Sequence, residues 1–440
     1  MRVDTYKVVH WMNVRKMTTR QVAQASGLDH GHLEEMLGVP GDGDWPDATT
    51  TAVARTLRIE PEKLGASGRR DLTVVTKTAR ELRDTRRPIQ RDGIHFYNYY
   101  TMAAPPGAVA PVILDILCPA GRVPALNNGH LEPAITVNLG PGDIHGRWGV
   151  ELDDTTWQVI KAAPRDDAWI VGDSYVEPSY CPHSYSLASD VPARIVSYTG
   201  RSNLAGLLED VNDWSEPAVL ELLDRLGEDP SPSALAGVLL ARRGHTLETA
   251  AAALGTSGEK LAAALDDGAV DVLRELGSAL GLDHRLLLRP ERRHDAAGKT
   301  YRDVAECLRD VRTFRGYEVT SLAGAPHLPD LVGQYMRVTG DAGEALCEPA
   351  ETHYLVTRGT LEIHWTGADG RAESAALGVD GTAWAAPFVT HRWSGDGALI
   401  KLGSGRHLGY LDLYELTNTY AAASTLRRGR RDGRSWGYDS

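Results

Sequence analysis

Cysteine is scarce in this sequence, with four residues in 440 and no two of them spaced as a CxxC pair. A set this sparse excludes the dense disulfide framework that stabilises small secreted domains. A reduced, cytoplasmic environment is therefore expected. The four residues are Cys118, Cys181, Cys307 and Cys347.

Long apolar runs are also absent. Charged residues interrupt the first sixteen positions, MRVDTYKVVHWMNVRK, and no later run approaches the roughly 18 apolar residues that a membrane span requires. We therefore expect neither a secretory leader nor a membrane segment.

The sequence has no excess of positive charge. Lys and Arg together number 47 against 59 Asp and Glu, which gives a net charge of −12 and an isoelectric point near 5.7. A chain with this balance lacks the electrostatic footprint of a nucleic-acid-binding protein. The 42% hydrophobic and 24% charged composition is typical of a globular protein, and 440 residues predict two to four domains.

An internal repeat organises the chain. Residues 18–28, followed by Leu33 and Leu37, have the pattern of two short helices around a glycine turn, as in a helix-turn-helix. The pattern recurs at 246–255, followed by Leu261 and Leu265. Two small helical modules are therefore predicted.

Short apolar runs separated by Gly, Pro and Asn follow each helical module, and they predict an all-β sandwich or barrel. The expected domains are 1–67 and 206–290, which are helical, and 68–205 and 291–440, which are barrels. We expect a linker at 227–232 and a solvated or self-packing strap from Thr425 onward. The predicted strands are 94–103, 112–117, 134–139, 169–171 and 194–198 in the first copy, and 317–322, 335–338, 354–356, 360–365 and 398–402 in the second.

Two segments of the first barrel carry candidate metal ligands. His130 lies in NNGHLEP, and His183 ends YVEPSYCPH about fifty residues later. Two histidines and one carboxylate are the donor set of a non-haem Fe(II) site, which leaves coordination positions open. Spacing leaves the carboxylate undecided, because Glu132 shares a strand face with His130 and Glu177 shares a Pro-bracketed loop with His183. Without a metal, the histidines would be polar residues inside a barrel.

The second repeat departs from this donor set. Aligning 351–355 with the first histidine segment places His353 at His130, and aligning 384–391 with 175–183 places His391 at His183. Leu355 and Ala386 then stand at the two carboxylate positions. Two imidazoles without an anionic ligand make a poor ferrous site, so one active site per chain is expected.

Further polar groups surround the first candidate site. Arg91, Tyr99 and Asn127 would supply guanidinium, phenol and amide donors, a set that suits a tetrahedral oxyanion such as phosphate or phosphonate. The alternative is that the arginine is a surface residue and that the tyrosine-rich strand serves barrel packing. The same strand also contains Tyr97, Asn98 and Tyr100.

Segments 87–100, 126–133, 172–186 and 425–438 closely resemble the hydroxyethylphosphonate dioxygenase family of tandem-cupin non-haem iron enzymes. The resemblance covers nearly the whole chain. It implies an α+β, mainly β fold, a tandem repeat of a helix-turn-helix-like domain followed by a cupin barrel. It also implies Fe(II) held by His130, Glu177 and His183, and substrate contacts from Lys16, Arg91, Tyr99 and Asn127.

The implied reaction converts 2-hydroxyethylphosphonate and O₂ into hydroxymethylphosphonate and formate, as in phosphonate natural-product biosynthesis. The expected partners are this small phosphonate and O₂, with neither nucleic acid nor a membrane, and the chain is a possible homo-oligomer. One rival is methylphosphonate synthase, which uses the same substrate. In that relative the third metal ligand looks like Gln, whereas this chain has Glu177. The others are a helix-turn-helix cupin regulator, disfavoured by the acidic segment 29–35, and an iron-free cupin.

Overall fold

The computed structural model describes most of the chain, and the helices and strands below come from these residues. The chain forms two compact units, one of 1–72 with 407–440 and another of 73–406. Most of the predicted linker and the arginine-rich tail lie outside the described residues. No helix among the described residues is long and apolar enough to cross a membrane. The described ranges are 1–38, 42–65, 73–91, 93–122, 125–149, 157–164, 169–200, 202, 204, 217–218, 220–221, 224, 231–287, 300–326, 328–340, 343–367, 370–404, 410–419, 421–422 and 425.

The first helical module confirms the predicted helix-turn-helix. Thr18 caps the second helix in a capping box with Gln21, and Gly27 ends that helix in the left-handed region at φ 71°. Val8, Val22 and Leu33 are fully buried in the core between the helices. The elements are β1 (Arg2–Asp4), α1 (Thr5–Val14), α2 (Thr19–Ser26), α3 (His30–Gly38), β2 (Asp42–Asp44), α4 (Asp47–Leu57) and η1 (Pro61–Leu64), and α13 (Tyr410–Thr417) belongs to the C-terminal part.

The second helical module repeats the first helix by helix. Thr246 forms a capping box with Thr249, as Thr18 does with Gln21. Lys16 and Gly244 follow the first helix of their modules, and both have positive φ, 56° and 76°. The elements are α8 (Pro232–Arg242), α9 (Leu247–Ala253), α10 (Gly258–Asp266), α11 (Val270–Leu280) and η3 (His284–Leu287).

The first barrel packs a seven-stranded sheet, in the order β13-β10-β7-β12-β6-β5-β4, against a three-stranded sheet, β11-β8-β9. Leu114 and Ile195 of the larger sheet meet Ile144 and Trp148 of the smaller one in a single core. The strands are β4 (Arg87–Arg91), β5 (Ile94–Thr101), β6 (Val112–Ile116), β7 (Ala134–Pro141), β8 (Ile144–Trp148), β9 (Trp157–Ile160), β10 (Ser174–Glu177), β11 (His183–Leu187) and β12 (Ala193–Thr199).

The prediction of a strand at 169–171 is wrong. These residues form a bend and carry no ladder, although Ile170 is fully buried and Trp169 packs against the same core. This short apolar run is therefore a loop whose side chains pack in the core, because a buried segment need not be a strand.

The second barrel is built on one eight-stranded sheet, β14-β15-β16-β20-β17-β19-β3, with β18 paired to β17. The runs predicted at 354–356 and 360–365 form one strand, which is irregular between Val356 and Arg358. The strands are β3 (Val74–Lys77), β14 (Arg312–Phe314), β15 (Tyr317–Ser321), β16 (Val332–Gly340), β17 (Glu351–Thr366), β18 (Ala372–Leu377), β19 (Thr382–Ala385) and β20 (His391–Ser404).

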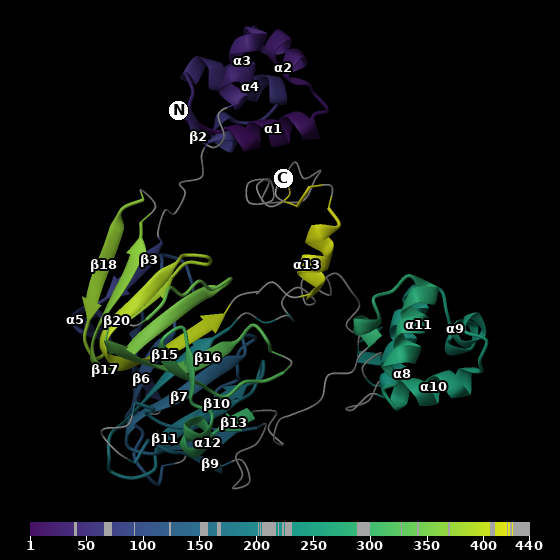
Figure 1. Ribbon diagram of the computed structural model, residues 1–440. Helices are drawn as coiled ribbons and strands as arrows, with labels where there is room; N and C mark the ends of the chain where they lie inside the picture. The colour runs from purple at the N-terminus through teal and green to yellow at the C-terminus, as the bar shows by residue number, and fades with distance from the viewer. Residues whose placement is uncertain are drawn as a thin grey trace. The chain divides into compact units, whose positions relative to one another are not determined.

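The two barrels exchange strands. β3 comes from the first half of the chain but pairs with β19 of the second barrel, and β13 (Thr300–Arg302) comes from the second half but pairs with β10 of the first (Figure 1). A short helix follows each exchanged strand, α5 (Ala79–Asp84) and α12 (Val304–Arg309). The predicted limits 68–205 and 291–440 therefore follow the order along the chain, whereas each barrel contains a strand from the other range.

Reciprocal contacts join the two barrels. The backbone N–H of Ala323 donates to Ser174 Oγ at 2.9 Å, and that of Ala103 donates to Thr382 Oγ1 at 3.0 Å. The Tyr335 hydroxyl accepts from the N–H of Gly172 at 3.1 Å and donates to its carbonyl. Ser174 and Gly172 belong to β10 and the segment just before it, so the second barrel directly holds this part of the first.

We expect Tyr335→Phe to lower the free energy of unfolding by about 1–3 kcal/mol, because it leaves the buried N–H of Gly172 without an acceptor. Chemical denaturation of the full chain measures the change. Tyr414→Phe, at a tyrosine that is about half exposed, is the matched control and should shift the transition less. Equal shifts in the two variants would contradict a specific role for the Tyr335 hydroxyl.

Candidate metal centre

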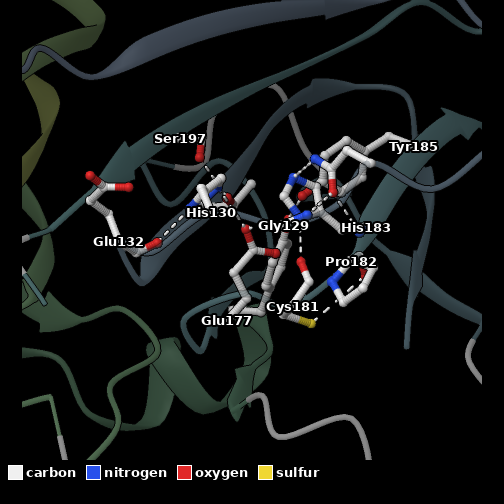
Figure 2. A network of polar contacts seen from close by, with 12 residues as sticks. Gly129, His130, Glu132, Glu177, Cys181, Pro182, His183, Tyr185 and Ser197 are labelled. Carbon is white, nitrogen blue, oxygen red and sulfur yellow. Dashed lines mark hydrogen bonds and ion pairs between the residues drawn. The ribbon is translucent and has the colours of Figure 1, made fainter. Parts of the chain in front are cut away.

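Three predicted side chains meet inside the first barrel. His130 precedes β7, Glu177 ends β10 and His183 begins β11. One ligand atom from each lies within 4.8 Å of the others, and no other such group of three His, Cys, Asp or Glu occurs among the residues that the structure describes. Figure 2 shows the Glu177 carboxylate beside the two imidazoles.

Backbone packing brings the loops of the site together. Gly129 has φ 71°, and a Cβ there would lie 2.5 Å from the carbonyl carbon of Tyr180. The N–H of Tyr180 donates to the carbonyl of His130, the residue after Gly129, at 2.6 Å. The approach therefore requires glycine at 129, and it fixes His130 opposite the loop that leads to His183.

Backbone carbonyls orient both imidazoles. His130 donates from Nδ1 to the carbonyl of Glu132 at 2.5 Å, and His183 donates from Nδ1 to the carbonyl of Cys181 at 3.0 Å. Such contacts fix the ring and its tautomer, which leaves Nε2 as the lone-pair nitrogen. Nε2 of His130 lies 3.8 Å from Glu177 Oε1. For His183 the nitrogen that lies near Glu177 Oε1 is Nδ1, at 3.4 Å, while its Nε2 accepts from Asn127 Nδ2 at 2.9 Å.

The carboxylate that joins the imidazoles is Glu177. The Glu132 side chain points away from the centre, and its contribution is the carbonyl that holds His130 (Figure 2). Spacing could not separate these two residues, because the choice depends on how the 178–182 loop closes over residues 127–133.

The Glu177 carboxylate is in an unfavourable environment on its own. The side chain is buried, and its Oε2 has no hydrogen-bond partner. Burial raises its pKa to about 8, although His130 and the nearby indole of Trp148 oppose the rise. Leaving a buried carboxylate oxygen unpaired is costly, and a cation beside it removes that cost. The donor set and the orphaned oxygen both fit a divalent metal with open positions.

The affinity for metal should depend on pH through Glu177. A metal binds the ionised carboxylate, so below about pH 8 binding must displace a proton, and the apparent affinity should rise with pH by up to about tenfold per unit. Above that pH the rise from this group should stop. Titration of the metal-stripped protein with Co(II) at several pH values measures this. Glu177→Gln cannot release this proton, and an equally steep slope in that variant would contradict the assignment.

A cavity of about 250 Å³ opens beside the two histidines. Tyr99 and Asn127, both predicted as substrate contacts, line it together with His130 and His183. Sequence reasoning missed Ser197, which also lines the cavity and accepts from Thr136 Oγ1 at 3.0 Å. The available signal was a polar residue at an inward position of the strand predicted at 194–198.

Two predicted contacts remain predictions. Arg91 ends β4, where it pairs with Ile94, but its side chain is outside the described part of the chain. Lys16 is exposed and belongs to the unit of residues 1–72 with 407–440, whereas the barrels belong to the other unit. Other polar groups on β5 serve packing, since Tyr100 donates to Asp115 and Asn98 accepts from Arg86.

The predicted alignment of the second repeat is partly wrong. The N–H of Tyr180 donates to the carbonyl of His130, and the N–H of Phe388 donates to that of Glu348, so Glu348 takes the place of His130. Four residues further on, Ala134 pairs with Glu177 and Thr352 pairs with Ala385. Ala385, and neither Ala386 nor Leu355, therefore stands at the position of Glu177.

His353 lies five residues after Glu348, as Ile135 does after His130, and it faces the contact between the barrels. Its Nδ1 is 3.1 Å from the carbonyl of Ala103, and its ring lies 4.9 Å from that of Tyr198. Burial lowers its pKa to about 4, which keeps it neutral at ordinary pH. The other match holds, because His391 donates from Nδ1 to the carbonyl two residues earlier, as His183 does.

The fold and the site define the class of the protein. A small β-barrel that gathers two imidazoles and one buried carboxylate beside a cavity is a cupin of the 2-His-1-carboxylate type. Residues 83–200 match the model of the 2-hydroxyethylphosphonate dioxygenase cupin-like domain. The chain is 55% identical over 446 residues to a 2-hydroxyethylphosphonate dioxygenase from Streptomyces viridochromogenes, with 100% of both chains covered. The chain belongs to the 2-hydroxyethylphosphonate dioxygenase family.

Solved structures give the same result. A variant of 2-hydroxyethylphosphonate dioxygenase is 54% identical, with a TM-score of 0.83 over 97% of this chain and 100% of that one. A PhpD structure with cadmium and hydroxyethylphosphonate is 53% identical, with a TM-score of 0.80 over 98% and 100%. A Streptomyces albus enzyme at 19% identity, with a TM-score of 0.70 over 96% of each chain, shares the fold.

Proposed function

We propose that the chain cleaves the C–C bond of 2-hydroxyethylphosphonate with O₂ to give hydroxymethylphosphonate and formate. The observation that carries this is the buried, orphaned carboxylate of Glu177 between two carbonyl-oriented imidazoles, in a chain 55% identical to a 2-hydroxyethylphosphonate dioxygenase. The reaction balances without another reductant, since C₂H₇O₄P and O₂ together equal CH₅O₄P and CH₂O₂. None of the four cysteines is joined in a disulfide, and we propose a cytoplasmic location.

Fe(II) is the metal that we propose for this site. Held by His130, Glu177 and His183, it would supply O₂ activation and a template for the substrate. Glu177 contributes one negative charge, and the carbonyls of Glu132 and Cys181 hold the two imidazoles beside it.

The phosphonate would be held by Arg91, Tyr99 and Asn127. Tyr99 and Asn127 line the cavity, and phenol and amide N–H groups donate to the oxygens of a tetrahedral anion. A guanidinium at Arg91 adds forked donors and charge. We also propose that Lys16 adds an ammonium over the bound substrate, in its own chain or in that of a neighbour if the protein is a homo-oligomer.

Anaerobic reconstitution with Fe(II) and 2-hydroxyethylphosphonate, followed by addition of O₂, tests the proposed function. Phosphorus NMR should show hydroxymethylphosphonate as the main product, with formate in equal amount. Methylphosphonate as the main product would assign the chain to the rival activity. Protein without added metal is the control and should leave the substrate unchanged.

We expect Glu177→Gln to slow turnover and to move part of the product toward methylphosphonate. Glutamine keeps the size of the ligand but removes one negative charge, which makes the bound metal more Lewis acidic. Phosphorus NMR of the variant's products measures the partition. Hydroxymethylphosphonate as the sole product of a slower variant would show that neighbouring groups, and not the charge of this ligand, decide the product.

A further inference from the structure

The second barrel preserves the outline of the metal centre with altered side chains. His391 takes the place of His183, Glu348 takes the place of His130, and Ala385 takes the place of Glu177. One imidazole is therefore kept, the second is replaced by a carboxylate, and the third position has no donor side chain.

A lysine enters this altered centre from β20. Lys401 pairs with Tyr354, as Ser197 pairs with Thr136, and Tyr354 and Thr136 lie six residues after Glu348 and His130. Lys401 thus takes the place of Ser197, which lines the cavity of the first barrel. Its side chain is only 9% exposed.

The ammonium of Lys401 is matched to the groups around it. Nζ forms an ion pair with Glu348 and lies 3.4 Å from the Gln334 amide oxygen. In the absence of a metal the remaining imidazole has a hydrogen-bond partner, since the Tyr354 hydroxyl lies 2.6 Å from His391 Nε2, as Asn127 Nδ2 lies 2.9 Å from His183 Nε2. The positive charge of Lys401 is among the causes that lower the pKa of His391, after burial.

Charge balance explains why these replacements occur together. A buried ammonium is stable only beside a counter-charge, and a buried carboxylate has the same requirement. In the first barrel, Glu177 Oε2 has no partner within the protein. In the second barrel, the carboxylate of Glu348 already has its cation on the same chain.

We infer that the Lys401 ammonium occupies the role of the divalent cation in the second barrel, and that this barrel takes a divalent metal once the lysine is removed and a carboxylate is restored at position 385. The metal that the restored site would take is a hard or borderline divalent cation, because its donors would be carboxylates and an imidazole. Both changes are needed, because Ala385 supplies no donor and Lys401 repels an incoming cation.

Co(II) titration of the metal-stripped full chain tests this, with bound equivalents counted from the visible absorption bands of the metal. The unsubstituted chain and Ala385→Glu should each bind one equivalent. Ala385→Glu combined with Lys401→Ser should bind two, and Ser is the residue of the first barrel at that place. Dioxygenase activity of the first barrel, measured on the same samples, reports that each variant is folded.

Two results would overturn the inference. A second equivalent bound by Ala385→Glu alone would show that the lysine does not exclude a metal, and a single equivalent bound by the folded double variant would show that no metal site underlies it. If the double variant loses first-barrel activity, Ala385→Glu with Lys401→Met gives the same test. Methionine keeps the length of the lysine side chain without its charge.

Discussion

Glu177→Ala is expected to leave the protein without tightly bound iron and to reduce turnover by more than about 100-fold. The variant removes the one anionic donor of the centre, and changes to groups that merely orient ligands already cost about 10–100-fold in metal affinity or activity. Metal analysis after anaerobic reconstitution and gel filtration measures the iron, and phosphorus NMR measures the product.

Glu132→Ala is the matched control for this loss. It removes the nearby carboxylate but keeps the backbone carbonyl that accepts from His130 Nδ1. This variant should therefore retain about one equivalent of iron. Loss of iron from Glu132→Ala with retention in Glu177→Ala would reverse the assignment of the carboxylate.

Arg91→Ala is expected to raise the Michaelis constant for 2-hydroxyethylphosphonate by at least about tenfold. The loss of one charge-assisted contact to a phosphonate oxygen costs about 1.5–3 kcal/mol, and about 1.4 kcal/mol corresponds to a factor of ten. Steady-state kinetics on the iron-loaded enzyme measure the constant.

The control for charge is Arg83→Ala, which removes an exposed arginine from α5. This variant should leave the Michaelis constant within about twofold, because an exposed charge contributes little across screened solvent. An unchanged constant in Arg91→Ala would remove this residue from the substrate site.

Local signals made much of the fold predictable. The capping box of Thr18 and Gln21 and the turn at Gly27 depend on neighbours within a few residues, so the helical modules could be predicted from the sequence. Short apolar runs along 134–139 and 194–198 predicted β7 and β12 for the same reason. Pairing partners were not predictable, because a three-residue strand such as β13 carries no information about the strand it joins.

For the candidate site, too, local signals were predictable and contacts between distant residues were not. A histidine next to Gly129 and another next to Pro182 marked two loops of the centre, but the choice of carboxylate depended on the contact between Tyr180 and His130. In the second repeat, matching histidine to histidine misplaced His353. The contact from the Phe388 N–H to the Glu348 carbonyl instead sets Glu348 at that position, and the ladder of β17 with β19 agrees. Both depend on residues far apart in the sequence.

The strand exchange also has a consequence for how the enzyme is made. β10 ends at Glu177, yet its edge is completed by β13, whose last residue is Arg302. At about 5–20 residues per second, a ribosome needs roughly 6–25 s to synthesise the intervening segment. During that interval a nascent chain exposes the unpaired edge of the strand that carries Glu177, and unpaired edges favour aggregation. The strand that carries Glu177 is therefore completed on both sides only after translation has passed into the second half of the message.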